Sequence, residues 1–300
     1  MIQYIDFPVQ KNNNVEQCAR IFHGRGGGYA GFEHVVIEWL PPVALIILYK
    51  EESHSWVMLL AKALQENLSS CISVQVQYRC RSKAPIEVVL GDEISGLVVD
   101  ECGLKFHIQL GRSQNIGIFL DMRNGRQWVR GAVAGKNVLN LFAYTCAFSV
   151  AAIAGGARQI VNLDLSKASL SRGRENHRLN DHDTSNVIFQ GVDIFKSFSR
   201  IRKYAPYDLL ICDPPDFQKG SVNAERDYKK ILRRVPELMS PGGQLMLCLN
   251  SFRLDEAFLH SLVGELCPGY CFVEEVKPPA VFVDAIAGSG LKVLVFKDRQ

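Results

Sequence analysis

The residues best suited to chemistry lie in the segment 208–217, which reads Asp-Leu-Leu-Ile-Cys-Asp-Pro-Pro-Asp-Phe. Its apolar run, 209–212, is short and bounded, as is typical of a strand buried on both faces of a parallel sheet. The two prolines end that strand and stiffen the backbone after Asp213. Because ligands of open α/β sheets bind beyond the carboxyl ends of strands, the acid, the proline turn and the ring of Phe217 should face a ligand together. This set suits methyl transfer to a planar nitrogen base.

Two further carboxylates occupy comparable positions. Asp164 ends the predicted strand 159–163 and comes 24 residues after Asn140. An acid about 20 residues beyond the first strand-to-helix turn is placed to bind both hydroxyls of a ribose. Asp193 follows the next predicted strand and could reach a purine amino group. One such acid is more often only a helix N-cap, but three in succession favour a nucleoside site.

The turn after the first of these strands, residues 140–149, contains no glycine. Enzymes that bind NAD or FAD use G-x-G-x-x-G there, which lets the backbone approach a pyrophosphate. The sequence therefore argues against a dinucleotide and favours a ligand without phosphates, such as S-adenosylmethionine (SAM). Phe142 and Tyr144 can pack on the adenosine or on the sulfonium, and a cation over an aromatic face gains about 0.5–2 kcal/mol.

Strands and helices alternate after residue 115, which predicts crossover units around a parallel sheet. We therefore expect a catalytic domain over residues 116–300. The predicted strands are 137–141, 159–163, 187–190, 209–212, 244–249, 272–276 and 291–297. The predicted helices are 149–154, 166–180, 227–239 and 254–266.

Residues 1–115 favour a separate α+β module of short strands and one helix, 56–66, which could contact RNA or another substrate. Gly91-Asp92 and Cys102-Gly103 are typical of hairpin turns. The segment 20–29 combines basic, aromatic and glycine residues, so it could grip a phosphate backbone or form a flexible surface loop. Its basic residues are Arg20, His23 and Arg25.

Composition narrows the class of protein. The chain has 300 residues, 47% of them hydrophobic, and a net charge of +3. No apolar run approaches the ~20 residues of a membrane helix and the N-terminus has no signal-peptide pattern, so we expect a cytoplasmic protein without a membrane partner. The nine cysteines are scattered without a zinc-binding spacing, which predicts reduced thiols and no metal. Three basic clusters, each also explicable as a solvated helix face, are 172–178, 200–203 and 229–234.

The motifs of this chain, taken in order, resemble those of the bacterial 23S ribosomal RNA methyltransferases that act on cytosine C5 or guanine N7, a class I SAM-dependent group. The similarity covers about residues 85–297. The motifs that carry it are Phe119-Leu-Asp-Met-Arg123, Asn140-Leu-Phe-Ala-Tyr-Thr145, Asp164, Asn176 and Asp213-Pro-Pro-Asp-Phe217. The resemblance implies an α/β, Rossmann-like domain of seven strands with the last one antiparallel, and a β-hairpin module ahead of it. It also implies SAM as cofactor and RNA, above all ribosomal RNA, as partner. Cys146 and Ala147 depart from the group, because relatives often carry glycine there.

From these motifs we expect two groups of contacts. Those to the cofactor are Phe142, Tyr144, Thr145, Cys146, Asp164, Leu165, Asp193, Ile194 and Asp213. Those to the reaction and the substrate are Asp213, Pro214, Phe217, Asn250, Arg123 and Lys219. Phe217 would stack on the base, while Asp213 and the Pro214 carbonyl would accept hydrogen bonds from its N–H groups. The oligomeric state stays open between monomer and homodimer.

Two residues bear on the atom that receives the methyl group. Cytosine C5 is not nucleophilic until a thiolate adds at C6, and Asn250 aligns with the catalytic cysteine of the cytosine-C5 relatives. Cys248 lies ~7 Å further back along the strand, and we expect it to be buried. Guanine N7 is already nucleophilic and needs no thiol, so we predict methylation of nitrogen. An exocyclic amine is a second candidate acceptor. The alternatives are a protein or small-molecule N-methyltransferase, and a SAM- or RNA-binding protein without turnover.

Overall fold

The computed structural model describes residues 1–8, 16–215, 217–218, 222–251, 253–286, 288 and 290–300. The chain divides into two compact units. Unit 1 comprises Met1–Asp121 and Pro279–Ala287, and unit 2 comprises Met122–Pro278 and Gly288–Gln300. The predicted boundary after residue 115 falls a few residues short of this division. Pro279–Ala287 belongs to unit 1 through contacts with distant residues, which no local pattern reveals.

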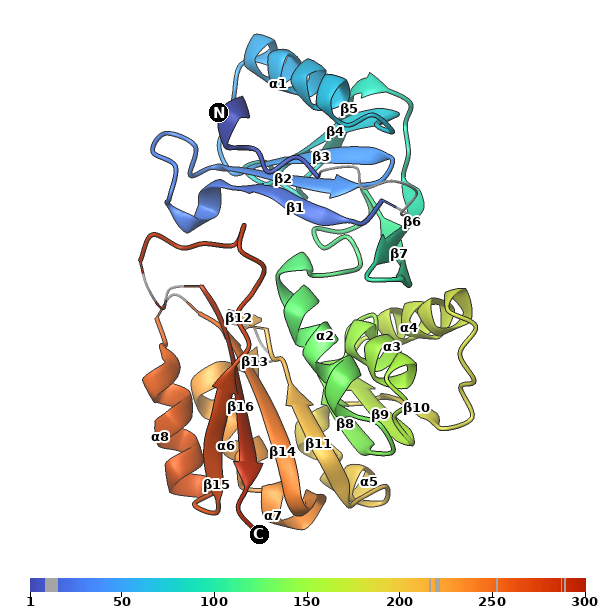
Figure 1. Cartoon of the computed structure of the whole chain (residues 1–300), viewed down its shortest axis with the longest axis vertical. Coiled ribbons are helices and arrows are strands. Elements are labelled where there is room, and N and C mark those ends of the chain that lie inside the picture. The colour runs from blue at the N-terminus through green and yellow to red at the C-terminus, as the bar shows by residue number, and fades with distance from the viewer. Residues whose placement is uncertain (9–15, 216, 219–221, 252, 287, 289) are drawn as a thin grey trace. The chain divides into compact units, whose positions relative to one another are not determined.

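Unit 2 is built on a seven-stranded sheet with the order β10-β9-β8-β11-β14-β16-β15 (Figure 1). Its strands are β8 (Asn137–Leu141), β9 (Gln159–Asp164), β10 (Val187–Gly191), β11 (Tyr207–Cys212), β14 (Met239–Asn250), β15 (Tyr270–Glu275) and β16 (Leu291–Asp298). β16 runs antiparallel to both neighbours, and the remaining strand pairs of the sheet are parallel. The predicted Rossmann-like sheet with an antiparallel last strand is confirmed.

Helices cover both faces of this sheet (Figure 1). They are α2 (Arg123–Ala132), α3 (Ala147–Ala154), α4 (Lys167–Leu179), α5 (Phe198–Arg202), α6 (Ala224–Leu232), α7 (Val235–Leu238) and α8 (Glu256–Leu266). Because strand residues alternate between faces, Val138 packs with Val129 of α2. Leu139 packs on the opposite face, in the cluster that contains Leu259 of α8. The predicted helix 227–239 is two helices, α6 and α7, because a proline suits only the first turn of a helix and Pro236 lies in the first turn of the second.

Unit 1 contains a five-stranded sheet with the order β1-β2-β3-β4-β5. The elements are β1 (Ala19–His23), β2 (Val35–Leu40), β3 (Val43–Leu48), α1 (His54–Asn67), β4 (Ser73–Tyr78) and β5 (Ile86–Gly91), followed by β6 (Gly96–Glu101) and β7 (Leu104–Gln109). β6 and β7 form the hairpin predicted at Cys102-Gly103. The hairpin predicted at Gly91-Asp92 is wrong, because β5 pairs with β4 and not with β6.

The glycine-rich segment brings backbones of unit 1 together. A Cβ on Gly24 would lie 1.9 Å from the carbonyl oxygen of Phe32, and one on Gly26 would lie 2.0 Å from that of Val283. The N–H of Ala285 donates to the carbonyl of Gly26 at 2.6 Å. Only glycine allows such close approach, so these glycines serve the packing of the returning segment Pro279–Ala287.

The basic residues of the same segment have partners inside unit 1. The guanidinium of Arg20 lies 2.5 Å from a carboxylate oxygen of Glu38 and 4.5 Å from the ring centroid of Phe282. Burial, with the nearby charges of Arg20 and Arg25, lowers the pKa of His23 to about 4. His23 is therefore neutral near pH 7. Residues 20–26 thus belong to a strand and a short 3₁₀ turn, whereas Arg25, Gly27 and Gly28 are exposed. Arg20 and His23 do not present free charges to a phosphate backbone.

Candidate functional site

The register of the parallel strands places two of the predicted acids at one edge of the sheet. Leu163 pairs with Leu141, and Leu141 pairs with Cys212. Asp164 and Asp213 are the next residues after Leu163 and Cys212, so they share the carboxyl edge, with β8 between their strands. At ~4.8 Å for each strand spacing, their backbones lie ~10 Å apart. The strand order reverses between β8 and β11, and open α/β sheets bind ligands at such a switch point.

The loop that follows β8 adopts a backbone normally reserved for glycine. Phe142, Tyr144 and Cys146 have φ angles of 59°, 46° and 61°, all in the left-handed region. Each such residue costs on the order of 1–3 kcal/mol unless its surroundings hold it in place. The loop thus forms tight turns without the glycines whose absence was noted in the sequence, and strain of this kind is characteristic of ligand-binding positions.

Asp164 is the main anchor of this loop. Its Oδ2 accepts a hydrogen bond from the N–H of Tyr144 at 2.8 Å, and its Oδ1 accepts one from the N–H of Ser166 at 2.7 Å. The N-cap of α4 is Ser166, whose hydroxyl accepts from the N–H of Ser169. The simple helix-cap alternative for Asp164 is therefore wrong. Each carboxylate oxygen still keeps a lone pair, which is the chemistry that binding of a ribose diol requires.

Helix α4 holds the same loop from a second side. The amide of Asn176 donates to the carbonyl of Thr145 at 3.0 Å. Gly173 approaches so closely that a Cβ there would lie 2.5 Å from Sγ of Cys146. The thiol of Cys146 is fully buried, and burial raises its pKa above the ordinary value. The whole residue is 0% exposed, so the structure does not support the predicted contact of Cys146 with the cofactor, whereas the half-buried Tyr144 has some exposed surface.

A series of buried, hydrogen-bonded polar side chains connects these elements. Asn140 on β8 donates to Asn162 on β9 at 2.9 Å, and Asn162 donates to the hydroxyl of Ser149 on α3 at 2.9 Å. Ser149 lies 2.9 Å from Nε2 of His177 on α4. Burial and the neighbouring His182 lower the pKa of His177 to about 3. The imidazole is therefore neutral, and these hydrogen bonds link β8, β9, α3 and α4.

The third acid lies just beyond β10. Asp193 accepts a hydrogen bond from the N–H of Phe195 at 2.9 Å and so begins the short 3₁₀ helix η4 (Ile194–Lys196). Ile194 is 4% exposed and packs in the core, which leaves little surface for the predicted cofactor contact. Leu165, by contrast, is 65% exposed and open to a ligand. The ring of Phe142 lies 6.3 Å from that of Phe195.

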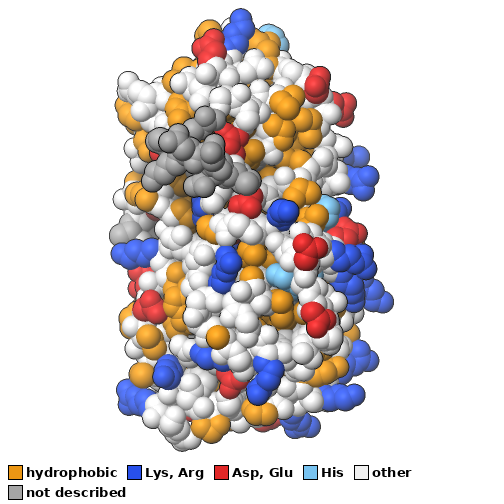
Figure 2. Space-filling view, turned by 45° about the vertical axis from the view of Figure 1, so that its right-hand side comes forward, with side chains coloured by type: hydrophobic (Ala, Val, Ile, Leu, Met, Phe, Trp, Pro, Cys, Tyr) orange, Lys and Arg blue, Asp and Glu red, His pale blue; other side chains and the backbone are white. Residues whose placement is uncertain are grey.

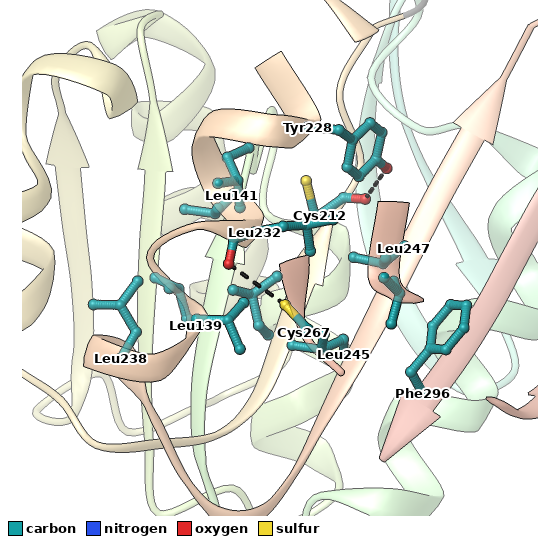
Figure 3. Packing of buried hydrophobic residues seen from close by; sticks show 14 of the residues in the cluster. Leu139, Leu141, Cys212, Tyr228, Leu232, Leu238, Leu245, Leu247, Cys267 and Phe296 are labelled. Atoms are coloured by element: carbon teal, nitrogen blue, oxygen red, sulfur yellow. Dashed lines mark hydrogen bonds between the residues drawn. The ribbon is translucent and has the colours of Figure 1, made fainter. Parts of the chain in front are cut away.

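At the end of β11, Asp213 is half-buried and Pro214 is buried. The hydroxyl of Tyr228 on α6 lies 3.1 Å from the carbonyl oxygen of Cys212 (Figure 3) and within hydrogen-bonding distance of that of Cys248, so its single proton is shared between the two carbonyls. Tyr228 was not predicted, because an aromatic residue on a helix is usually part of the core. It connects β11 and β14 at the edge where the acids lie.

The expectations for β14 and for the substrate residues fare differently. Cys248 is fully buried among apolar side chains, as predicted, and Asn250 is exposed at the end of β14. Arg123 is half-buried at the first residue of α2. Phe217 belongs to the short strand β12 (Phe217–Gln218), but its side chain lies outside the described part of the structure, as does the whole of Lys219.

Two further features concern the described residues alone. They contain no group of three or more His, Cys, Asp and Glu side chains placed to hold a metal ion. None of their helices is long and apolar enough to span a bilayer.

Comparison with known proteins finds relatives that carry the same name. Ribosomal RNA large subunit methyltransferase I of Erwinia tasmaniensis is 36% identical over 264 residues, which cover 81% of this chain and 66% of that protein. The protein of the same name from Aeromonas salmonicida is 34% identical over 173 residues, which cover 56% of this chain and 44% of that protein. The chain thus spans less than two thirds of either relative.

A candidate SAM-dependent methyltransferase from Streptococcus mutans has a solved structure that matches with a TM-score of 0.84 and 25% identity, over 95% of this chain and 76% of the other. A candidate methyltransferase solved in complex with SAH matches with a TM-score of 0.83 and 25% identity, over 94% of this chain and 76% of the other. The family model of S-adenosylmethionine-dependent methyltransferases matches residues 19–297. This chain therefore belongs to the S-adenosylmethionine-dependent methyltransferase family.

Proposed function

We propose that this protein transfers the methyl group of SAM to a base of large-subunit ribosomal RNA. The observation that carries the proposal is the alignment of Asp164, the left-handed loop 142–146 and Asp213 around the switch point between β8 and β11. The names of the relatives point to the RNA. Bound SAM would supply an electrophilic methyl group. Asp164 would hold its ribose, with Asp193 and the loop positioned for the adenine and the sulfonium.

The acceptor atom in this proposal is a nitrogen. Attack from cytosine C5 requires a thiolate that reaches C6 of the base. Cys248 packs in the apolar core, and the exposed residue at the end of the same strand is Asn250, which has no nucleophilic sulfur. Guanine N7 already carries a lone pair, so positioning alone can supply most of the rate. Guanine N7 or an exocyclic amine is therefore the proposed target.

The residues at the end of β11 have complementary roles in this scheme. Asp213 and the carbonyl of Pro214 would accept hydrogen bonds from the N–H groups of the base and thereby orient its lone pair. Phe217 would stack on the ring, which is worth about 1–3 kcal/mol for a base on an aromatic side chain. Lys219 and Arg123 would pair with phosphates, because both carry the required charge.

A basic surface on unit 2 supports a nucleic-acid substrate. Segments 193–203 and 224–237 contain nine basic and four acidic residues, a net charge of +5 compared with +3 for the whole chain. They lie side by side, because Lys230 contacts the ring of Phe195 at 4.9 Å and Arg234 that of Phe198 at 5.2 Å. We call this the α5–α6 surface. Lys and Arg side chains also gather in groups on the face shown in Figure 2, and such groups attract phosphate backbones.

Mass-spectrometric mapping of ribosomal RNA from strains with and without the gene tests the proposal. We expect one methylated nucleoside to disappear with the gene and to return when the purified protein and SAM are added. Label from tritiated SAM that entered protein instead of RNA would contradict the substrate.

The same assay separates nitrogen from carbon. Cys248→Ala should keep its activity within about twofold, since a buried thiol takes no part in the reaction. A covalent adduct with RNA that contains 5-fluorocytosine would overturn the nitrogen assignment.

A further inference from the structure

The ladder between β11 and β14 stops just before the reactive positions. Their last paired residues are Cys212 and Leu247. Pairing cannot continue through Pro214 and Pro215, because proline has no N–H to donate. β14 nevertheless runs on to Asn250, paired with β16 alone. Beyond Cys212 and Leu247 the ladder itself no longer sets the spacing between the ends of β11 and β14.

Tyr228 is placed to do this. Its hydroxyl lies within hydrogen-bonding distance of the carbonyls of Cys212 and Cys248, one from each strand. The side chain is 1% exposed, and its ring packs edge-on against Phe258 of α8 with centroids 6.4 Å apart. Burial holds the pKa of the hydroxyl well above its ordinary value, so the group stays protonated and remains a donor. Figure 3 shows the hydroxyl pointing at the backbone of Cys212.

We infer that Tyr228 is a positioning residue for methyl transfer, which clamps the ends of β11 and β14 and so fixes Asp213 relative to Asn250. Asp213 follows the first clamped residue directly, and Asn250 comes two residues after the second. An error of ~1 Å in the placement of reacting groups can cost on the order of 100-fold in rate. The expected effect on methyl transfer rests on the proposed function, whereas the expected effect on the spacing of β11 and β14 rests on the hydrogen bonds alone.

The chain offers a matched control at the other end of the same strand. Tyr207 is also fully buried, and its hydroxyl donates to the backbone carbonyl of Ile201 at 2.7 Å. Tyr207→Phe and Tyr228→Phe each remove one buried hydroxyl and keep the ring, so both should lower stability, by similar amounts. Only Tyr228→Phe should lower kcat/KM for RNA, by about tenfold, while the Kd for SAM stays within twofold of the wild type. Equal effects of the two variants on kcat/KM, or none, would overturn the inference.

A double-mutant cycle distinguishes positioning from a loss of folded protein. Asp213→Asn serves here in place of alanine, because its amide oxygen still accepts a hydrogen bond and should leave residual turnover to measure. If Tyr228 acts through Asp213, then Tyr228→Phe should cost little of that residual activity, because residues that act as a unit are not additive. Independent, multiplicative losses would contradict the inference. Assays are run at a temperature at which SAM binding shows each variant to be fully folded.

Amide hydrogen exchange gives a readout that does not depend on the substrate. Tyr228→Phe should speed exchange in the backbone of residues 246–251, and Tyr207→Phe should leave it unchanged. If the wild-type protein methylates no RNA, the proposed function fails, and exchange alone decides the clamp. Unchanged exchange in Tyr228→Phe would overturn it.

Discussion

Replacing Gly173 by alanine tests how the loop 142–146 is held. Gly173 lies in the middle of α4, and an added Cβ would come 2.5 Å from Sγ and 2.8 Å from Cβ of Cys146. Carbon atoms in contact prefer about 3.5–4.0 Å. The sulfur could turn aside, but the Cβ of a fully buried residue moves only with its backbone. The substitution should therefore push the loop away from α4.

The magnitude follows from two opposing terms. Alanine gains about 1 kcal/mol over glycine inside a helix, and overpacking of this kind costs about 1–3 kcal/mol. Gly173→Ala should therefore lower the free energy of unfolding by about 0–2 kcal/mol. Gly264→Ala is the matched control, because Gly264 also lies within a helix, α8, and a Cβ there would meet nothing within 4 Å. It should stabilise the protein by about 1 kcal/mol.

Urea unfolding and calorimetric titration with SAM measure the two consequences. We expect Gly173→Ala to weaken SAM binding at least about tenfold, since the displaced loop no longer meets the cofactor, and Gly264→Ala to leave it unchanged. Adding Cys146→Gly should restore affinity, because glycine removes the clashing atoms and tolerates the φ of 61°. If the two alanine variants stabilise equally, or if the second substitution restores nothing, the reasoning about the loop is refuted.

The remaining predictions concern Asp164 and Asp213, the α5–α6 surface and His177. Asp164→Ala should abolish detectable SAM binding, whereas Asp213→Ala should spare the Kd for SAM and remove turnover. Calorimetry measures the binding and tritiated SAM measures the turnover, and the opposite pattern would refute the assigned roles. Replacing Arg200, Lys203 and Arg233 with glutamine should reduce the slope of log Kd for RNA against log salt by about 2, while Lys297→Gln with Arg299→Gln should leave the slope near that of the wild type. Burial lowers the pKa of His177 in the folded state to about 3, from an ordinary 6.5. The contribution of the neutral imidazole to the free energy of unfolding is therefore complete above pH 6.5 and is lost as the pH falls towards 3, by roughly 1.4 kcal/mol for each pH unit. His177→Gln should flatten the pH dependence of the free energy of unfolding measured with urea, and an unchanged slope would contradict this reasoning.

The fold of unit 2 could be predicted because its signals are local. Apolar runs that each end in an acid or a turn marked the parallel strands, and the match of the motifs to a known group implied seven strands with the last one antiparallel. The positions of Asp164 and Asp213 at a shared edge followed from the same pattern. The isolated Gly173 inside a predicted helix is a local sign of a close approach.

Other features depend on contacts between distant segments, which no local pattern reveals. Gly91-Asp92 has the composition of a hairpin turn, but the pairing of β5 with β4 was decided by neighbours elsewhere in the chain. Tyr228 has a role only because β11 and β14 present carbonyls on either side of it. The burial of Cys146 likewise depends on how closely α4 approaches the loop.

Pro279–Ala287 interrupts the second unit between β15 and β16 yet belongs to the first. Neither unit is therefore encoded by one continuous stretch of the gene. A truncation or fusion with a single junction near residue 121 would separate Phe282 from Arg20 and His23, against which its ring normally lies. Recombination at one breakpoint thus cannot exchange the N-terminal unit for another module. Any such replacement, in evolution or in the laboratory, must rewrite the β15–β16 connection at the same time.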